Sequence, residues 1–251
     1  MQPLIIVSFL LAVFTSSCTK DEYGRTYTDV ETPAAPVVPT MPPVPVDTPG
    51  VKTYLALGDS YTIGQSVSEA ERYPNQLAAL LKQDSIVIGQ PEIIARTGWT
   101  TFDLLARLNS NPPLNNSYDI VTLLIGVNNQ YQRLSQANYR EEFKVLLEKA
   151  IAYAGKKRTN VIVLSIPDYG VTPFGMGSNS ALISSQVDSF NVINRDVTIT
   201  EGCTYVDITP SSKEALTNPG LVASDGLHPS GSEYRKWALM LEPIFKALVK
   251  K

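Results

Sequence analysis

The stretch Tyr54-Leu55-Ala56-Leu57-Gly58-Asp59-Ser60-Tyr61 decides the fold expected for this chain. An apolar run stops at Gly58, and a serine follows two residues later. This pattern predicts a buried strand over 52–57 that ends in a tight turn. In an open parallel sheet, sites are built at the carboxyl ends of the strands, so Ser60 would stand at such an end. Taken alone, Gly-Asp-Ser is more typical of an ordinary surface turn.

Apolar runs of strand length alternate with helical patterns along the rest of the chain. This alternation predicts a parallel sheet with helices on both faces. We therefore expect an α/β fold, a flavodoxin-like three-layer α/β/α sandwich with a mostly parallel central sheet of about five strands. The further strands are expected over 92–95, 119–125, 160–166 and 204–207, and the helices over 74–82, 100–108, 138–154, 185–199 and after Pro229.

Three local features carry their own predictions. The pair Asn138 and Glu141 predicts a capped start for the helix over 138–154, and Gly155 predicts its end. The segment 167–182 contains three glycines and no clear period, which predicts a long loop. Pro243 predicts a kink or a break in the last helix.

Size and composition exclude several classes of protein. The 251 residues, 43% of them apolar and 18% charged, fit one globular domain with a proper core. The net charge of −3, without a basic patch, gives no indication of nucleic-acid binding. Two cysteines cannot build a disulfide framework, and the single histidine makes a zinc site improbable. No phosphate-binding glycine loop is present. We expect no metal and no cofactor.

The N-terminus resembles a bacterial lipoprotein signal. The apolar run 4–14 is shorter than the roughly 20 residues of a membrane span and fits a secretory signal. Small residues at 15–17 precede Cys18, which the resemblance makes the lipid-attachment residue after removal of 1–17. Two departures stand: no Lys or Arg precedes the run, and Thr15 replaces the usual aliphatic residue. An ordinary cleaved signal is the alternative.

The segment 18–50 is expected to be a tether. No packed element is predicted from Gly24 to Gly50, and seven prolines between Pro33 and Pro49 favour an extended spacer. The predicted organisation is a signal peptide over 1–17, the anchor and tether over 18–50, and one domain over 51–251. The expected location is the cell envelope, as an exported outer-membrane lipoprotein that faces the periplasm or the cell surface and meets the membrane through its anchor.

Polar residues follow the ends of three predicted strands. Ser60 follows the first, Gly98 the second and Asn128 the third, whereas Asp225 and the sole histidine, His228, come just before the last helix. Because the carboxyl ends of parallel strands lie on one edge of a sheet, the first three positions are expected to converge. Each feature alone has an ordinary structural explanation as a turn, and it is their joint occurrence that predicts a site.

These four blocks resemble those of the SGNH (GDSL-type) hydrolase and esterase superfamily, in its exported bacterial lipoprotein form. They are the serine of Gly58-Asp59-Ser60-Tyr61, then Gly98, then Asn128, and Asp225 with His228 in Asp-Gly-Leu-His-Pro. The likeness runs from about Lys52 to the C-terminus. Tyr61 stands where the namesake motif has Leu, a departure that does not touch the reacting atoms.

The residue types match serine-hydrolase chemistry. The Ser60 hydroxyl needs a base, which His228 would supply. Asp225, three residues before it, would hold the other imidazole nitrogen. The resemblance further implies an oxyanion hole made by the backbone N–H groups of Ser60 and Gly98 and by the Asn128 amide.

Two other residues are alternative candidates for these roles. Asn129 competes with its neighbour for the amide, and Asp207 is a rival acidic partner for the histidine. Asp59 is expected to hold the turn beside the nucleophile. Cys203 has no second histidine to activate it and is expected to be a buried apolar residue.

The function expected from the resemblance is hydrolysis of carboxylic esters by a serine esterase through an acyl-enzyme. The substrate would be an acetylated carbohydrate, a lysophospholipid or a similar acyl ester. The loop 169–176 is a candidate for holding an acyl chain, and Trp99 and Tyr131 for stacking on a sugar ring. An acyltransferase with the same site and a non-catalytic surface glycan-binding protein remain alternatives. The oligomeric state is not readable from the sequence.

Overall fold

The computed structural model describes residues 19–20, 26–27 and 50–249. The predicted signal peptide, Cys18 and most of the predicted tether lie outside the described residues. Within 18–50, the strands β1 (Thr19–Lys20) and β2 (Thr26–Tyr27) pair in antiparallel fashion. The sequence pattern predicts no packed element between Gly24 and Gly50, so strand β2 corrects that prediction. Thr and Tyr, its two residues, both favour strands.

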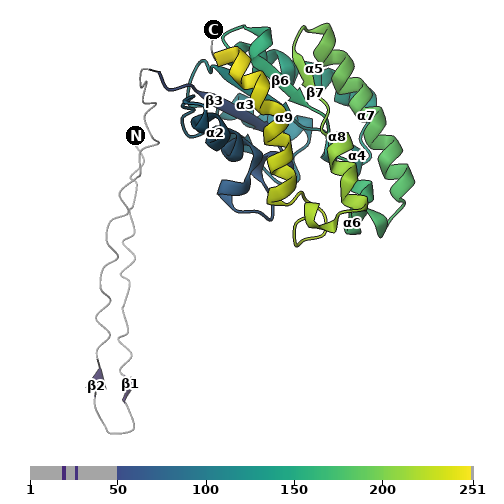
Figure 1. Cartoon of the computed structure of the whole chain (residues 1–251). Coiled ribbons are helices and arrows are strands. Elements are labelled where there is room, and N and C mark those ends of the chain that lie inside the picture. The colour runs from purple at the N-terminus through teal and green to yellow at the C-terminus, as the bar shows by residue number, and fades with distance from the viewer. Residues whose placement is uncertain (1–18, 21–25, 28–49, 250–251) are drawn as a thin grey trace, which may run out of the picture. The chain divides into compact units, whose positions relative to one another are not determined.

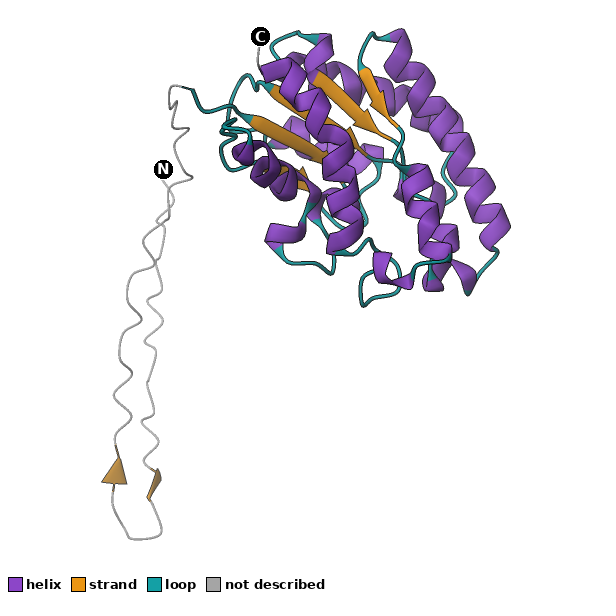
Figure 2. Cartoon of the chain, viewed as in Figure 1, coloured by secondary structure: helices purple, strands orange, loops and turns teal. Residues whose placement is uncertain are grey.

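The domain is built on a five-stranded sheet in which every pairing is parallel (Figures 1 and 2). The strand order β4-β3-β5-β6-β7 is the flavodoxin-like order, so the predicted fold class is confirmed. Most strand ends fall within two residues of the prediction. The strands are β3 (Tyr54–Gly58), β4 (Glu92–Ala95), β5 (Ile120–Leu124), β6 (Val161–Leu164) and β7 (Thr204–Val206).

Helices cover both faces of the sheet, as Figure 2 shows. On one side α2 packs against α9, and on the other α5 contacts both α3 and α7. The long helices are α2 (Tyr73–Gln83), α3 (Thr101–Ser110), α5 (Gln136–Tyr153), α7 (Ser180–Thr200) and α9 (Gly231–Val249).

Two predictions about helices are wrong, and a third is wrong in part. Helix α5 begins after Ser135, whose hydroxyl accepts the Asn138 N–H, and not at an Asn138/Glu141 pair. The predicted long loop contains the short helices η3 (Tyr169–Val171) and α6 (Pro173–Met176), and α7 starts inside it, where the Asn179 side chain caps the Leu182 N–H. At Pro243 the predicted break is wrong, whereas the alternative, a kink, stays a prediction.

Helix α9 continues through Pro243. Pro243 is exposed, while Leu241 and Phe245 on either side of it are fully buried. The proline ring therefore lies on the solvent side, where water can satisfy the backbone carbonyl that loses its partner. Burial of its neighbours holds the helix together across this position.

Several short helices connect the long elements. They are α1 (Ser60–Ile63), η1 (Glu69–Glu71), α4 (Val127–Tyr131), η2 (Arg158–Asn160), α8 (Thr209–Lys213), η4 (Glu214–Leu216) and η5 (Pro219–Leu221). With three to five residues each, they are too short to leave a periodic pattern in the sequence.

The core joins strand β3 to helix α9. The ring of Tyr54 on β3 meets Phe245 edge-on, with centroids 5.1 Å apart. Its hydroxyl lies 2.9 Å from Thr122 Oγ1 on β5, which satisfies a polar group that burial would otherwise penalise. Trp237 of α9 is fully buried, and its indole N–H donates to Glu233. Each large apolar side chain buried in this way contributes about 1.5–3 kcal/mol.

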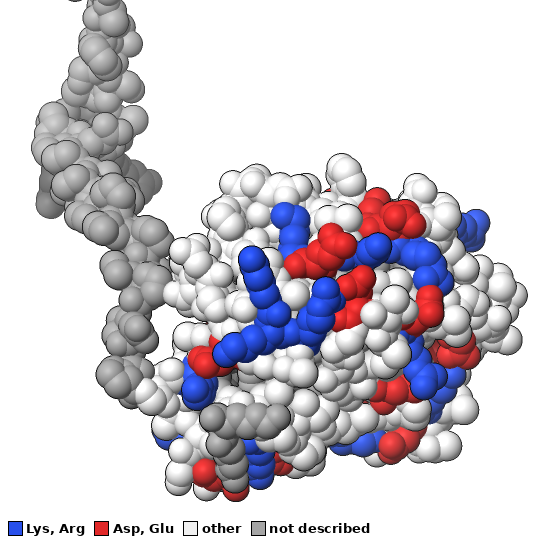
Figure 3. Space-filling view, turned by 90° about the horizontal axis from the view of Figure 1, so that it is seen from above, with Lys and Arg blue, Asp and Glu red and all other residues white. Residues whose placement is uncertain are grey.

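The surface seen in Figure 3 carries basic and acidic side chains side by side. Ion pairs of the domain include Lys52 with Asp119 and Arg158 with Glu201. Among the described helices, none combines the length and the apolar character needed to cross a membrane.

Candidate active site

The ends of three neighbouring strands lie level with one another. Gly58, the last residue of β3, is in register with Ala95 of β4 on one side and Leu124 of β5 on the other. The chain passes from β3 to β4 at one side and returns to β5 at the other, so the strand order reverses at β3. The segments that follow these three ends therefore meet at the switch point where α/β folds bind ligands.

The turn after β3 presents Ser60. A side chain at Gly58 would bring a Cβ to 2.2 Å from Thr62 Oγ1 and 2.4 Å from the Leu124 carbonyl, so only glycine fits. Asp59 caps α1, and its Oδ1 accepts the Tyr61 N–H at 3.0 Å. Ser60 is the first residue of α1 and is 4% exposed. As the sequence predicts, Asp59 holds the turn.

Asp59 is a buried carboxyl directly before Ser60 in the chain. Burial raises its pKa to about 7, because the charged form loses its hydration. The backbone amides of Tyr61, Asp59 and Gly126 oppose this rise only in part. The carboxyl therefore changes charge near neutral pH without contact with solvent.

The turn before α9 joins the acid to the histidine. The carboxylate Oδ2 of Asp225 lies 2.6 Å from His228 Nδ1, and its Oδ1 accepts the backbone N–H groups of Leu227 and His228 at 2.9 and 3.0 Å. Gly226 supplies the positive φ of 72° that closes this turn. The contact orients the imidazole so that Nδ1 donates to the carboxylate and Nε2 is left as the basic nitrogen.

A third partner of this pair comes from a distant loop. Ser66 Oγ donates to Asp225 Oδ2 at 2.6 Å. Burial raises the pKa of Asp225, but the hydrogen bonds from Ser66, from His228 and from the backbone outweigh it and hold that pKa below its usual range. The carboxylate thus stays ionised at neutral pH, although its side chain is only 30% exposed. No sequence signal links Ser66 to a residue 159 positions away.

Asp207, the alternative acidic partner for His228, binds other residues in the structure. Asp207 Oδ1 accepts from Ser165 Oγ at 2.9 Å and from the Thr209 N–H at 3.2 Å, so it organises the turn after β7.

Cys203 is buried, and burial raises the pKa of its thiol to about 11. A thiol with such a pKa is a poor nucleophile at neutral pH.

The two adjacent asparagines of α4 have different partners. Asn128 Nδ2 donates to the Trp99 carbonyl at 2.9 Å, and Asn128 lines the same cavity as Ser60. Asn129 is buried and binds Thr101 twice, accepting its N–H at 3.0 Å and donating to its Oγ1 at 2.6 Å. A side-chain amide carries two N–H bonds, so Asn128 keeps one that is not used by Trp99.

The segment after β4 brings Gly98 to the same cavity. Its φ is 86°, and a Cβ there would meet no atom within 4 Å, so backbone conformation and not crowding favours glycine. The Trp99 N–H donates to the Arg96 carbonyl and closes the turn that contains Gly98. Ser60, Gly98 and Asn128, which follow three strand ends, thus line one space.

That space is a cavity of about 200 Å³ with Ser60 and His228 in its wall. No Asp, Glu, Lys or Arg lines it. Within the described residues, Ser60 Oγ and the imidazole share this cavity but are not hydrogen-bonded, and such contacts are commonly long before substrate binds. The remaining lining residues are Tyr61, Thr97, Val127, Tyr131, Tyr169, Phe174 and Leu227.

Three aromatic rings form one wall of this cavity. The centroids of Tyr131, Tyr169 and Phe174 lie 6.3 to 6.4 Å apart in all three pairs. Tyr131 and Phe174 are 57% and 44% exposed, so a ligand would cover them. Trp99, which the sequence analysis proposed as a residue that stacks on a sugar, instead packs against the core. Val127 is a lining residue that the sequence did not single out.

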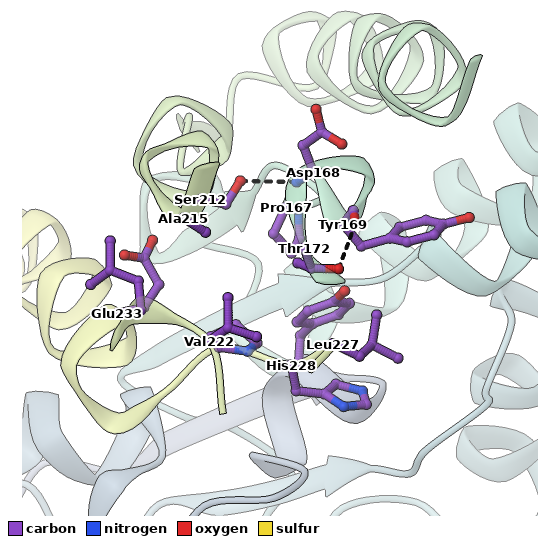
Figure 4. Close-up of a pocket in the computed structure, with 13 residues that line it drawn as sticks. Pro167, Asp168, Tyr169, Thr172, Ser212, Ala215, Val222, Leu227, His228 and Glu233 are labelled. Atoms are coloured by element: carbon purple, nitrogen blue, oxygen red, sulfur yellow. Dashed lines mark hydrogen bonds between the residues drawn. The ribbon is translucent and has the colours of Figure 1, made fainter. Parts of the chain in front are cut away.

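A second, smaller cavity lies on another side of His228 (Figure 4). Its volume of about 20 Å³ suffices for one water molecule. Ser60 is not among its lining residues. Figure 4 shows the hydrogen bond from the Asp168 N–H to Ser212 Oγ, 2.9 Å long, in its upper wall.

In the described part of the chain, no three His, Cys, Asp or Glu side chains are grouped so that they could hold a metal ion.

A family model matches residues 56–236, and its description is the GDSL-like lipase/acylhydrolase family. No curated protein matches the chain.

Solved structures share the fold at low sequence identity. A lipase/acylhydrolase from Enterococcus faecalis aligns with a TM-score of 0.63 at 18% identity, over 78% of this chain and 96% of that one. The acetylxylan esterase Axe2 from Geobacillus stearothermophilus gives 0.58 at 18% identity, over 80% and 94%. A structure of TesA gives 0.57 at 19% identity, over 78% and 99%.

Proposed function

The chain belongs to the GDSL-like lipase/acylhydrolase family and is a hydrolase that acts on esters, and from this premise we propose that it cleaves carboxylic esters through a Ser60–His228–Asp225 triad and an acyl-enzyme. One observation carries the proposal. Ser60 and His228 line one cavity, and the imidazole is held through Nδ1 by the Asp225 carboxylate.

In the proposed reaction, Ser60 Oγ attacks the ester carbonyl and His228 Nε2 takes its proton. Asp225 fixes the imidazole and stabilises its charged form. The oxygen of the tetrahedral intermediate accepts from the Ser60 and Gly98 N–H groups and from the free Asn128 N–H. The intermediate collapses when His228 returns the proton to the leaving alcohol.

Water then completes the cycle. His228 removes a proton from the water that attacks the acyl-enzyme, and the second intermediate releases the carboxylic acid and free Ser60. The chain's own residues account for every proton transfer in this scheme. An acyltransferase would use the same site with an alcohol in place of water, and product analysis with added alcohols separates the two.

The cavity supports an uncharged ester as the substrate. An acyl chain gains from contact with Val127, Leu227 and the aromatic wall, because these surfaces are apolar. A sugar ring would instead stack on the exposed face of Tyr131. Both an acyl ester of a lipid and an acetylated carbohydrate therefore remain candidate substrates, and a lysophospholipid would have to keep its phosphate outside the cavity.

Covalent labelling tests the nucleophile. A fluorophosphonate probe is expected to modify Ser60 in the native protein and to leave the Ser60→Ala variant unlabelled. A panel of aryl esters from acetate to long acyl chains, together with acetylated glycans, would then define the substrate. Folded native protein that neither labels nor hydrolyses any ester would refute the proposal and favour a glycan-binding role.

We also propose that the protein is exported and anchored in the cell envelope through a lipid on Cys18. The support comes from the apolar run 4–14, the small residues at 15–17 and the proline-rich segment that follows. Mass spectrometry of the mature N-terminus is expected to find an acylated Cys18. An unmodified N-terminus at another residue would contradict the anchor and leave the esterase proposal untouched.

A further inference from the structure

The loop after the nucleophile turns back onto it. Helix α1 ends at Gly64, whose φ of 69° reverses the chain. The N–H groups of Gly64 and Gln65 both reach the carbonyl of Ser60, the latter at 3.0 Å. Gly64 and Gln65 are therefore tied to the backbone of Ser60, and Ser66 follows directly after them.

Gln65 connects this loop to the segment after β4. Its Oε1 accepts a hydrogen bond from Thr97 Oγ1 at 2.6 Å. Thr97 directly precedes Gly98, whose amide is a proposed oxyanion donor. The position of that amide relative to Ser60 thus depends on a side-chain contact across two loops that are 32 residues apart.

Ser66 connects the same loop to the turn before α9. Its Oγ donates to Asp225 Oδ2 at 2.6 Å, the oxygen that also faces His228 Nδ1. The backbone of Ser66 has a φ of 67°, a conformation that side chains other than Asn, Asp and Gly rarely adopt. Ser66 thus adopts a strained backbone conformation and also donates its hydroxyl to the Asp225 carboxylate. Closing a turn does not by itself require that hydroxyl.

We propose that Gln65 and Ser66 are positioning residues that hold the Gly98 segment and the Asp225 turn in register with Ser60. The proposal rests on the proposed function. The two adjacent side chains bind different segments: Gln65 binds Thr97 beside the proposed oxyanion hole, and Ser66 binds Asp225. Their hydrogen bonds keep the three separate segments at the distances that attack and proton transfer require.

The surroundings of Asp225 make this link testable by titration. The titratable groups facing it are His228 and the phenols of Tyr61 and Tyr234. Burial raises the pKa of both phenols well above the ordinary value, so they stay neutral. Asp59 titrates near pH 7 but does not contact Ser66 and contributes equally to native protein and variants. A change on removing the hydroxyl therefore reports on the Asp225–His228 pair.

Two substitutions at position 66 separate the hydroxyl from the backbone. Ser66→Ala and Ser66→Gly both remove the hydroxyl, but glycine alone relieves the positive φ. If the hydroxyl matters, both variants lose about tenfold or more in kcat with little change in KM, since the bond is made to a charged group. Without it the Asp225 carboxylate accepts one hydrogen bond fewer and attracts the charged imidazolium more strongly. The acidic limb of the pH profile, which reports protonation of the catalytic base, is therefore expected to move upward.

The matched control is Ser68→Ala. Ser68 lies in the same loop, and its hydroxyl donates to Glu71 Oε2 at 2.7 Å, away from the triad. This variant is expected to keep the native kcat and pH profile. For position 65, Gln65→Leu is expected to lower kcat several-fold, whereas Gln65→Glu retains an acceptor oxygen for Thr97 and restores most of the activity.

The single histidine gives a readout that does not need catalysis. Protein labelled with ¹⁵N-histidine reports on His228 alone, and its imidazole shifts are followed against pH in native protein, Ser66→Ala and Ser68→Ala. The expected result is a displaced titration in Ser66→Ala only.

The outcomes decide the two proposals separately. If native protein is inactive but Ser66→Ala displaces the imidazole titration, the esterase proposal fails and the Ser66 link stands. If native protein is active while both position-66 variants keep kcat within twofold and the imidazole titration is unmoved, the positioning role of Ser66 is overturned. Equal activity of Gln65→Leu and Gln65→Glu would overturn the role of Gln65.

Discussion

The side-chain amide of Asn128 donates a 2.9 Å hydrogen bond to the carbonyl of Trp99. Asn128 follows β5 and Trp99 follows β4, and β3 lies between these two strands. The bond therefore ties the two outer segments together across the end of the strand that carries Ser60. It also orients the amide and uses only one of its two N–H bonds.

This relationship predicts that Asn128→Ala lowers kcat by about 10²–10³-fold, because one preorganised oxyanion donor is lost. The matched control is Asn129→Ala at the next position. That variant loses the two bonds to Thr101 and is expected to lower thermal stability while the folded fraction keeps its activity. Ester hydrolysis and thermal melts on both variants check the contrast, and equal effects on kcat would contradict it.

The contact between Asp225 and His228 carries a second prediction. Asp225→Asn keeps the shape of the side chain but lets the wrong imidazole nitrogen carry the proton, so kcat should fall by about 10⁴-fold. Asp207→Asn is the comparison, because Asp207 contacts Ser165 and Thr209 instead of the histidine. A larger loss for Asp207→Asn than for Asp225→Asn would reassign the acid of the triad.

The buried carboxyl of Asp59 predicts a pH-dependent stability. Its pKa is about 7 in the folded state and near 3.8 when exposed, so the folded state binds more protons between these values. The free energy of unfolding is therefore lowered as pH rises from about 4 to about 7, and the loss persists above that range.

Asp59→Asn removes this effect and keeps an acceptor for the Tyr61 N–H. The gain in stability of the variant over native protein is expected to grow by roughly 2–4 kcal/mol between pH 4 and pH 8. Urea unfolding of both proteins at the two pH values measures the difference. A gain that is the same at both values would show that Asp59 is ionised, or protonated, throughout.

The aromatic wall predicts a change in substrate preference. Phe174→Ala is expected to lower kcat/KM for long acyl esters about tenfold relative to acetate, because apolar contact is lost only with the longer groups. Met176 lies on the same short helix, is 50% exposed and does not line the cavity, so Met176→Ala should leave the preference unchanged. If the wall holds the alcohol portion instead, the change will follow the alcohol series and not the acyl series.

Much of the architecture is readable from local pattern. Continuous apolar runs such as the one before Gly58 predict buried parallel strands, because such strands are covered on both faces. The parallel arrangement then predicts that Ser60, Gly98 and Asn128 lie at one edge, as the register of Gly58 with Ala95 and Leu124 confirms. These features depend on residues close together in sequence.

Other elements cannot be predicted from the local sequence pattern. The short helix α6 and the early start of α7 have too few residues or too weak a period to stand out from a loop. The continuity of α9 through Pro243 depends on burial of Leu241 and Phe245, which is a property of the packed core. Propensity alone predicts a break there.

By itself the sequence determined the parallel α/β class, the strand ends at which Ser60, Gly98 and Asn128 stand, and the Asp225–His228 spacing, because periodicity and turn chemistry act over a few residues. Only the tertiary structure decided that Asn128 and not Asn129 enters the cavity, that Asp207 is occupied elsewhere, and that Gln65 and Ser66 reach Thr97 and Asp225. Such choices depend on hydrogen bonds between residues tens to hundreds of positions apart, which form once the core has brought their segments together.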